Sequence, residues 1–286
     1  WCQINFGYPV GKYFVIISDP AHFQSSLFIF VQFLYMSLRF GRLLLVFLFM
    51  GLYSFHAEGQ DQTKTVIKQK MAVTGYSSNF EFSPKLSLSA EIQERISFDP
   101  YRQSQMFVKS QMSYEAFKDF TFANGIAYYL NTPIDPDISK SFKVPEIRLN
   151  HDFKYSHDLR SLELGHRIRM EERFIKKRLG DSLLSGSRFV ERISYLLSLE
   201  YKLRDSKHHD LYLKLSDSVY MNAGKSMAHN TFDQNRFYAG LNYQLLKNLT
   251  VEVGYINLYQ QRISRLEYLN RNIASLAISH SVKLYH

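Results

Sequence analysis

Charged side chains recur at every second position of the stretch LELGHRIRMEERF, residues 162–174. Glu163, Arg167, Arg169, Glu171 and Arg173 alternate with a mostly apolar set, and Gly165 is the one gap. Carboxylates and guanidinium groups at this spacing can form ion pairs across strands, and rings of arginine favour anions. In a helix these charges would spread around the circumference, whereas in a strand they share one face. The stretch therefore predicts a β-strand with one charged face.

Two environments suit such a strand. An antiparallel sheet over an ordinary core would turn the charged face to solvent. A transmembrane barrel would turn the charged face to the lumen and the apolar face to lipid. One strand does not decide between them, so the rest of the chain must.

Similar alternation recurs along the chain, and turn residues separate one run from the next. Runs of ten to sixteen residues are longer than ordinary strands but match tilted strands that cross a bilayer. We expect strands at Lys64–Tyr76, Lys85–Ile96, Gln105–Tyr114, Phe120–Leu130, Val144–Tyr155, Leu159–Phe174, Arg188–Leu203, Asp210–Tyr220, Asn235–Leu246, Leu249–Gln260 and Asn272–Tyr285.

The connections alternate between tight and long, as in outer-membrane barrels. Tight turns are expected at 82–84, 115–119, 156–158, 204–209 and 247–248, and longer loops at 97–104, 131–143, 175–187, 221–234 and 261–271. The predicted fold is all-β, an antiparallel transmembrane up-and-down β-barrel of 10–12 strands, with short periplasmic turns and longer extracellular loops. Twelve strands are slightly preferred, because an antiparallel barrel with both termini in the periplasm needs an even number.

Thirteen charged residues are expected to face the lumen of this barrel. Arg167, Arg169 and Arg173 are predicted to pair with carboxylates from adjacent strands, which would make the lumen a self-neutralising plug. The alternative is a small anion-preferring pore lined by arginine, for passive solute transport. The thirteen residues are Glu91, Arg95, Arg148, Asp152, Glu163, Arg167, Arg169, Glu171, Arg173, Arg192, Glu200, Lys214 and Glu252.

A second alternative is an outer-membrane lipid hydrolase, because some twelve-stranded barrels are lipases. Such an enzyme needs a nucleophile, a histidine base and an orienting amide. His166 with Ser198, or His280 with Ser279 and Asn242, supply these residue types. No nucleophile motif surrounds them, so we assign no catalytic residue.

No metal or cofactor is assigned either. His208 and His209 lie in an expected tight turn and lack carboxylate or cysteine partners at ligand spacing. Residues 233–235 lead from a long loop into a strand, which predicts a turn or loop-ordering role. The net charge of +9 might suggest nucleic acid, but the basic residues alternate along strands instead of clustering, so no nucleic-acid partner is expected.

The amino-terminal region reads as a targeting segment. From Met36 onward, Arg39 and Arg42 precede the apolar run Leu43–Phe55, and small residues precede Gln60. This order predicts a secretory signal peptide over 36–59, cut before Gln60. Residues 1–35 are then an over-extended gene start without function, and 60–286 form the barrel domain. A single longer anchor over 27–55 is the alternative, but Gln32 and two arginines would interrupt it.

Three stretches together resemble a known family. They are LGHRIRMEERF (164–174), RFVERISYLLSLEY (188–201) and TFDQNRFYAGLNYQLLKNLTVEVGYIN (231–257). They are similar to an uncharacterised family of Bacteroidetes-type outer-membrane barrels, the domain of unknown function 2490, over about residues 67–285. The resemblance implies a barrel in the outer membrane of a Gram-negative bacterium. Expected partners are outer-membrane lipid and, during folding, the barrel-assembly machinery. The family carries no established activity, so the resemblance transfers no catalytic residue.

Overall fold

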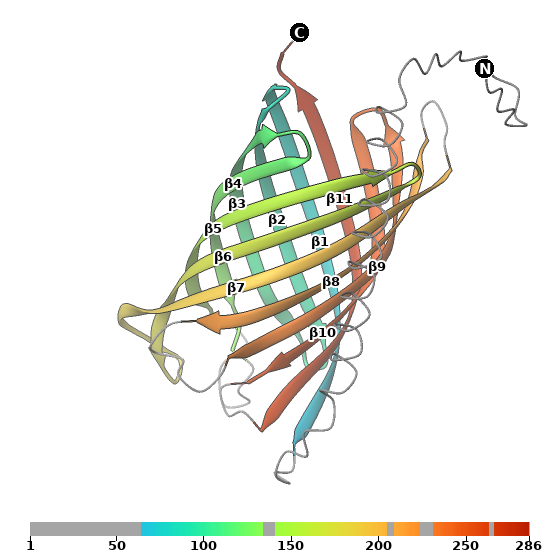
Figure 1. Ribbon diagram of the computed structural model, residues 1–286. Helices are drawn as coiled ribbons and strands as arrows, with labels where there is room; N and C mark the ends of the chain where they lie inside the picture. Colours follow the sequence, from blue (N-terminus) through green and yellow to red (C-terminus); the bar gives the residue numbers. More distant parts are fainter. Residues whose placement is uncertain (1–63, 134–140, 205–208, 224–230, 263–265, 286) are drawn as a thin grey trace, which may run out of the picture. The chain divides into compact units, whose positions relative to one another are not determined.

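Eleven long strands form the described part of the chain (Figure 1). The computed structural model describes residues 64–133, 141–204, 209–223, 231–262 and 266–285. The strands are β1 (Thr65–Ser83), β2 (Leu86–Phe98), β3 (Tyr101–Phe117), β4 (Phe120–Asn131), β5 (Val144–Leu159), β6 (Leu162–Leu179), β7 (Ser182–Arg204), β8 (Leu211–Ala223), β9 (Phe232–Leu246), β10 (Leu249–Gln261) and β11 (Glu267–Lys283).

The strands close into a barrel through one parallel pair. Each strand pairs antiparallel with the next, but β1 and β11 run in the same direction, from Thr65 opposite Glu267 to Glu81 opposite Lys283. The predicted all-β barrel of 10–12 strands is confirmed, but the preference for twelve strands and for a wholly antiparallel wall is wrong. An odd number of strands that alternate in direction always brings the first and last together in parallel. The strand expected at 64–76 forms the first part of β1.

Because the number of strands is odd, the start of the first strand and the end of the last strand lie at opposite ends of the barrel. We call the end that holds the β1–β2, β3–β4, β5–β6, β7–β8 and β9–β10 connections the turn end, and the opposite end the loop end. Strand β1 begins at the loop end, where Thr65 pairs with the start of β11. Strand β11 finishes at the turn end. The first strand therefore starts and the last strand ends on opposite sides of the barrel, whereas in an even-stranded barrel both would lie on one side.

Two of the expected long loops are two-residue turns instead. Asp99 and Pro100 connect β2 to β3, and Gly180 and Asp181 connect β6 to β7. Strand β7 reaches 23 residues. Around 176–178 the sequence is basic on both faces, so apolar alternation stops there while backbone pairing continues. Alternation marks where a strand has one apolar side, and it does not mark where the strand ends.

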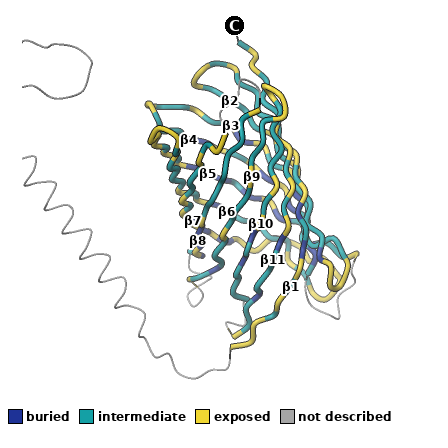
Figure 2. The backbone as a smooth tube through the Cα atoms, turned by 90° about the vertical axis from the view of Figure 1, so that its right-hand side faces the viewer, coloured by how far each residue is buried: buried dark blue, intermediate teal, exposed yellow. Residues whose placement is uncertain are grey.

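Burial is inverted relative to a soluble sheet. Along the first half of β5, Glu146, Arg148, Asn150 and Asp152 are buried, while the intervening Ile147 is 44% exposed. Large apolar residues on neighbouring strands are exposed in the same way, including Ile126, Ile168 and Val253. Exposed positions recur along the strands in Figure 2. Charged residues therefore point into the barrel and apolar residues point outward.

An apolar cluster backs the parallel seam from inside. Met71, Ile273, Ile256 and Tyr238 are successive cross-strand partners on β1, β11, β10 and β9. The first three are at most 5% exposed. This packing supports the one place where the wall is joined by strands from opposite ends of the sequence.

Paired glycines make room for the ring of Tyr238. Gly240 and Gly254 face each other on β9 and β10, and a Cβ atom at either position would collide with the Tyr238 side chain. An aromatic ring that covers glycines on a neighbouring strand is a device that fixes register in sheets.

None of the described residues forms a helix long and apolar enough to cross a membrane. The gene-start and signal-peptide predictions, over 1–35 and 36–59, lie outside the described residues.

The parallel seam can be tested by cross-linking. The Ser77 and Ser279 hydroxyl oxygens lie 2.9 Å apart across β1 and β11. Ser77→Cys combined with Ser279→Cys should form a disulfide on mild oxidation, because directly paired residues meet the distance that this bond needs. Non-reducing electrophoresis and mass spectrometry measure it. Ser77→Cys with Ser281→Cys is the control, since it is displaced by two residues. A twelfth strand between β1 and β11 would leave both pairs unlinked.

Candidate functional site: the charged lumen

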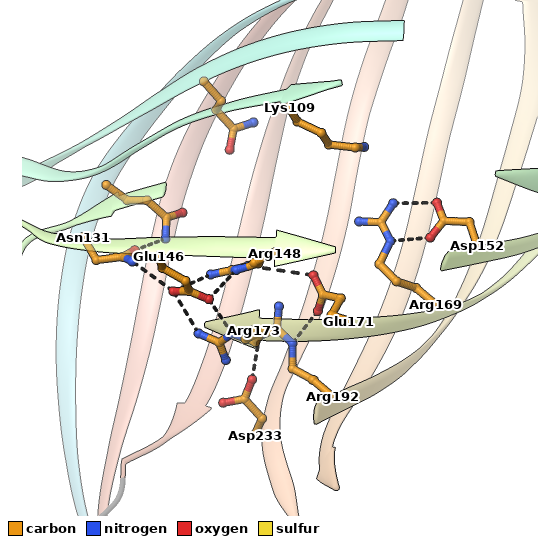
Figure 3. A network of polar contacts seen from close by, with 12 residues as sticks. Lys109, Asn131, Glu146, Arg148, Asp152, Arg169, Glu171, Arg173, Arg192 and Asp233 are labelled. Atoms are coloured by element: carbon orange, nitrogen blue, oxygen red, sulfur yellow. Dashed lines mark hydrogen bonds and ion pairs between the residues drawn. The ribbon is translucent and has the colours of Figure 1, made fainter. Parts of the chain in front are cut away.

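Glu146 is the centre of the interior charge network (Figure 3). Its carboxylate is 2% exposed and accepts hydrogen bonds from Arg148 at 2.6 and 3.2 Å and from Arg173 at 2.6 and 3.2 Å. The Asn131 amide donates a further bond at 3.0 Å. Two cations and an amide thus surround one buried carboxylate, which joins β4, β5 and β6.

A second carboxylate continues the network toward β7. Glu171 lies 3.8 Å from Arg148 and accepts a short bond from the Nε of Arg192. The Nη1 of Arg192 donates to Asp233 on β9 at 2.7 Å. Arg192 thus connects two acids on strands that are not neighbours in the wall.

Neutral amides extend these contacts around the barrel. Gln260 donates to Asp233 at 3.4 Å and accepts from Arg271 at 2.9 Å, and Arg271 also donates to Gln69 on β1 at 2.9 Å. At the other end of the network, Gln105 on β3 donates to Asn131 at 2.6 Å. We call this continuous set the interior belt. Its residues are Gln69, Gln105, Asn131, Glu146, Arg148, Glu171, Arg173, Arg192, Asp233, Gln260 and Arg271.

A separate ion pair lies closer to the turn end. Arg169 on β6 binds Asp152 on β5 with two hydrogen bonds, of 2.6 and 2.7 Å. Asp152 is fully buried, and the Gln111 amide on β3 donates to it at 2.9 Å. The paired, planar geometry is the strongest form of arginine–carboxylate contact.

Aromatic rings support two of the belt arginines. The Arg148 guanidinium lies 3.6 Å from the centre of the Tyr129 ring, and that of Arg192 lies 4.8 Å from the Tyr220 ring. Cation–π contacts of this kind stabilise a desolvated guanidinium and hold its plane.

These residues enclose a cavity of about 450 Å³ in the loop-end half of the lumen. Glu91, Glu146 and Glu171 are its acidic lining residues, whereas nine cationic residues line it. Ser104, Thr132 and Val144, near the loop-end limits of β3, β4 and β5, also line it. The cationic residues are Arg95, Lys109, Arg148, Arg167, Arg169, Arg173, Arg192, Arg236 and Arg271.

Half of the eight cavity arginines are not neutralised by a carboxylate. Arg148, Arg169, Arg173 and Arg192 form ion pairs, and Lys109 lies 3.7 Å from Glu91. Within the described part of the chain, no carboxylate lies at ion-pair distance from Arg95, Arg167, Arg236 or Arg271. The prediction that Arg167 pairs with an adjacent carboxylate is wrong, because its cross-strand partners, Lys154 and Leu196, offer none.

The predicted lumen residues nearest the turn end are mostly acidic. Glu163 and Glu200 are cross-strand partners on β6 and β7, and Lys214 lies opposite Glu200 on β8. Lys214 pairs with Glu252 at 3.2 Å. Three glutamates and one lysine form this acidic group, so the predicted set of lumen residues divides into an acidic group near the turn end and a mainly cationic group around the cavity.

A further cation lies beside the loop end of the cavity. Lys143, just before β5, donates to the Thr132 hydroxyl at 2.6 Å and to the Gln103 carbonyl at 3.1 Å. Burial lowers the pKa of Lys143, and repulsion from Arg102 lowers it further.

Several interior residues escaped the sequence prediction. Asp233 was expected in a turn, but β9 begins at Phe232, which places Asp233 inside the barrel as a partner of Arg192. Glu146 stands in the same alternating series as Arg148 and Asp152, and that spacing could have revealed it. Lys109 and Arg236 also lie within strands that were expected. Arg271 precedes the expected start of its strand by one residue.

The structure separates the residues considered for hydrolysis. His166 points outward, where its ring contacts Tyr195 at 2.7 Å, whereas Ser198 donates to the Gly165 carbonyl on the inner side. Ser279 contacts Ser77, and His280 instead contacts Asn248 at 2.8 Å. Neither histidine therefore meets its suggested nucleophile.

Only one residue of the expected His208–His209 turn is described. His209 stacks on Tyr243, with 5.9 Å between ring centres, and His208 lies outside the described residues.

The fold and this interior define a closed β-barrel with an apolar exterior and a charged lumen. A family model described as "Protein of unknown function (DUF2490)" matches residues 73–270, and the chain belongs to this family. Among solved structures, the chain is similar to LpxR from Salmonella typhimurium, with a TM-score of 0.40 and 7% identity over 69% of this chain and 83% of that one. No curated protein matches the sequence.

Two arginines on one face of β6 give a matched test of the network. Arg169→Ala should lower the free energy of unfolding by roughly 3–5 kcal/mol, because it leaves the buried Asp152 carboxylate without its counter-charge. Arg167→Ala should change stability by less than about 1 kcal/mol, since it leaves no carboxylate unpaired. Urea unfolding of both variants in lipid vesicles measures the difference. Equal losses in the two variants would contradict the assigned pairing.

Proposed function

We propose that this protein is an outer-membrane β-barrel with a charge-filled lumen, which binds a solute or supports the membrane instead of serving as an open diffusion pore. The observation that carries the proposal is the inversion of burial between the two faces. Val253 is 58% exposed and Ile126 is 54% exposed on the outside, while Glu146 and Asp152 are buried inside. Apolar surface that alternates with a charged interior is what a lipid-facing barrel requires.

The interior belt supports a closed lumen. It links nine of the eleven strands of the described barrel through contacts of 3.8 Å or less. Arg95 on β2 and Arg236 on β9, which lie on opposite sides of the seam, line the same cavity. Side chains from separate walls therefore come close to one another across the interior.

An anion-preferring pore is the second candidate. Its support is the excess of cationic over acidic side chains around the cavity. Rings of arginine select anions when a continuous aqueous path exists. Such a path would also have to pass the acidic group at the turn end, which opposes anion flow.

The proposal places the turn end in the periplasm and the loop end outside, by analogy with the usual arrangement of such barrels. Outer-membrane lipid would then contact the apolar exterior, and the barrel-assembly machinery would insert the chain. The host would be a Gram-negative bacterium, of the Bacteroidetes type that the sequence resemblance suggests.

Adjacent residues on β7 test the lipid-facing assignment. Leu197 is 41% exposed on the outer face, and Ser198 faces the lumen. Leu197→Arg should lose roughly 2–4 kcal/mol of stability in a bilayer if it lies near the midplane. Ser198→Arg should lose less, because its side chain enters a polar interior. Folding of both variants into lipid vesicles is followed by gel mobility and circular dichroism, which report the loss of stability. Equal tolerance would identify a soluble barrel.

Conductance separates the two functional candidates. The refolded parent protein in planar bilayers should show no steady single-channel current, because the interior belt holds the walls together. Arg169→Ala, which weakens one wall, should produce a leak. A parent that conducts steadily and prefers chloride over potassium would replace the first candidate with the anion pore.

A further inference from the structure

Three buried guanidinium nitrogens in the cavity have no hydrogen-bond acceptor among the described residues. They are the Nε atoms of Arg95, Arg167 and Arg236. An unsatisfied buried donor is costly, and a charged one more so. Arg95 Nη2 donates to the Gln93 amide oxygen at 3.2 Å, and the partners of Arg271 are also neutral amides. We call Arg95, Arg167, Arg236 and Arg271 the free-arginine group.

The register of the sheet places three members of this group in one row. Arg167 is followed across the wall by Leu196 and Ser218, and then by Arg236. Leu258 then separates Arg236 from Arg271. The intervening side chains are short or apolar, so none of them caps the guanidinium groups, and all three arginines line the cavity.

Arg95 completes the group from the other side of the seam. Arg95, Arg236 and Arg271 line the same cavity, together with Arg167 and the buried Tyr220. Four cationic groups therefore line one cavity, and no carboxylate of the described residues lies at ion-pair distance from any of them.

We propose that the free-arginine group binds a compact solute that carries two or more phosphate groups. The planar guanidinium presents several donors in the geometry that phosphate oxygens accept, and it stays charged at all physiological pH values. The cavity volume of about 450 Å³ suits a small molecule. Its mostly polar lining favours a hydrophilic anion over a long apolar one.

Charge along the lumen fixes the direction of entry. Arg95, Arg236 and Arg271 lie toward the loop ends of their strands, whereas Glu163, Glu200 and Glu252 lie toward the turn ends of theirs. An anion would therefore be attracted from the loop end and repelled from further passage. This deepens the proposed function and rests on it in one respect, because the loop end faces outside only if that function is correct.

Binding can be measured on the full barrel folded into zwitterionic vesicles. Isothermal titration with inorganic tripolyphosphate, at constant ionic strength in potassium chloride, should give saturable binding with one site. Arg95→Gln and Arg236→Gln should each weaken the affinity at least tenfold, because each removes a charge-assisted contact. Lys214→Gln is the matched control, since its amine pairs with Glu252 away from the cavity. It should bind as the parent does.

Stability without ligand gives a readout that a merely structural role would not produce. Arg236→Gln should raise the melting temperature of the unliganded barrel, because it relieves repulsion with Arg95, and should reduce the further rise caused by tripolyphosphate. Unchanged affinity in both arginine variants would overturn the proposal, as would sulfate binding equally well at the same ionic strength.

Two further outcomes also decide against the proposed solute. The first is competition by lipid. If phosphatidylglycerol vesicles abolish tripolyphosphate binding to the parent but not to Arg236→Gln, the site serves a lipid phosphate instead. Absence of any tripolyphosphate binding refutes the site altogether. Neither result alters the conductance or the Leu197→Arg comparison, so failure here is distinguishable from failure of the proposed function.

Discussion

A buried carboxylate enclosed by two arginines is the contact on which the interior depends. Glu146 is almost fully buried, and without Arg148 and Arg173 its charge would be severely destabilising in that position. Because the two arginines come from β5 and β6, satisfying the carboxylate fixes the register between these strands. Arg148 then reaches Glu171, and the contacts continue from wall to wall. A polar network of this kind stabilises the barrel only when its members are satisfied together.

The interior is nevertheless uneven in a way that a purely structural network would not need. Cations outnumber acids around the cavity, Glu163, Glu200 and Glu252 gather near the turn end, and apolar side chains back the seam. A network selected only to hold strands together would match each arginine with an acid. The chain instead retains four arginines without carboxylate partners, at a cost in stability. Such local conflicts with folding are characteristic of binding sites.

Alternation in the sequence was sufficient to predict the barrel class and the inward face of β6. Every second residue from Glu163 to Arg173 follows one rule, and this rule depends only on local chain geometry. Pairing is different, because it depends on which residues a neighbouring strand places opposite. Arg167 and Arg169 are equivalent in the sequence pattern, yet Asp152 lies opposite Arg169 and Lys154 lies opposite Arg167. The odd number of strands could not be predicted for a similar reason, since no local pattern encodes how the first strand meets the last.

The parallel seam also has a consequence for how the barrel is made. Ser77 and Ser279 touch although 202 residues separate them in the sequence. All other wall contacts join strands that are consecutive in the chain, so they can form as short-range hairpins. The seam alone requires closure of a loop that spans nearly the entire barrel, and its entropy must be lost before any seam contact compensates for it. Until that moment the sheet carries two unpaired edges, which are sites for wrong association. Closure is therefore the step at which this chain most needs protection from its neighbours.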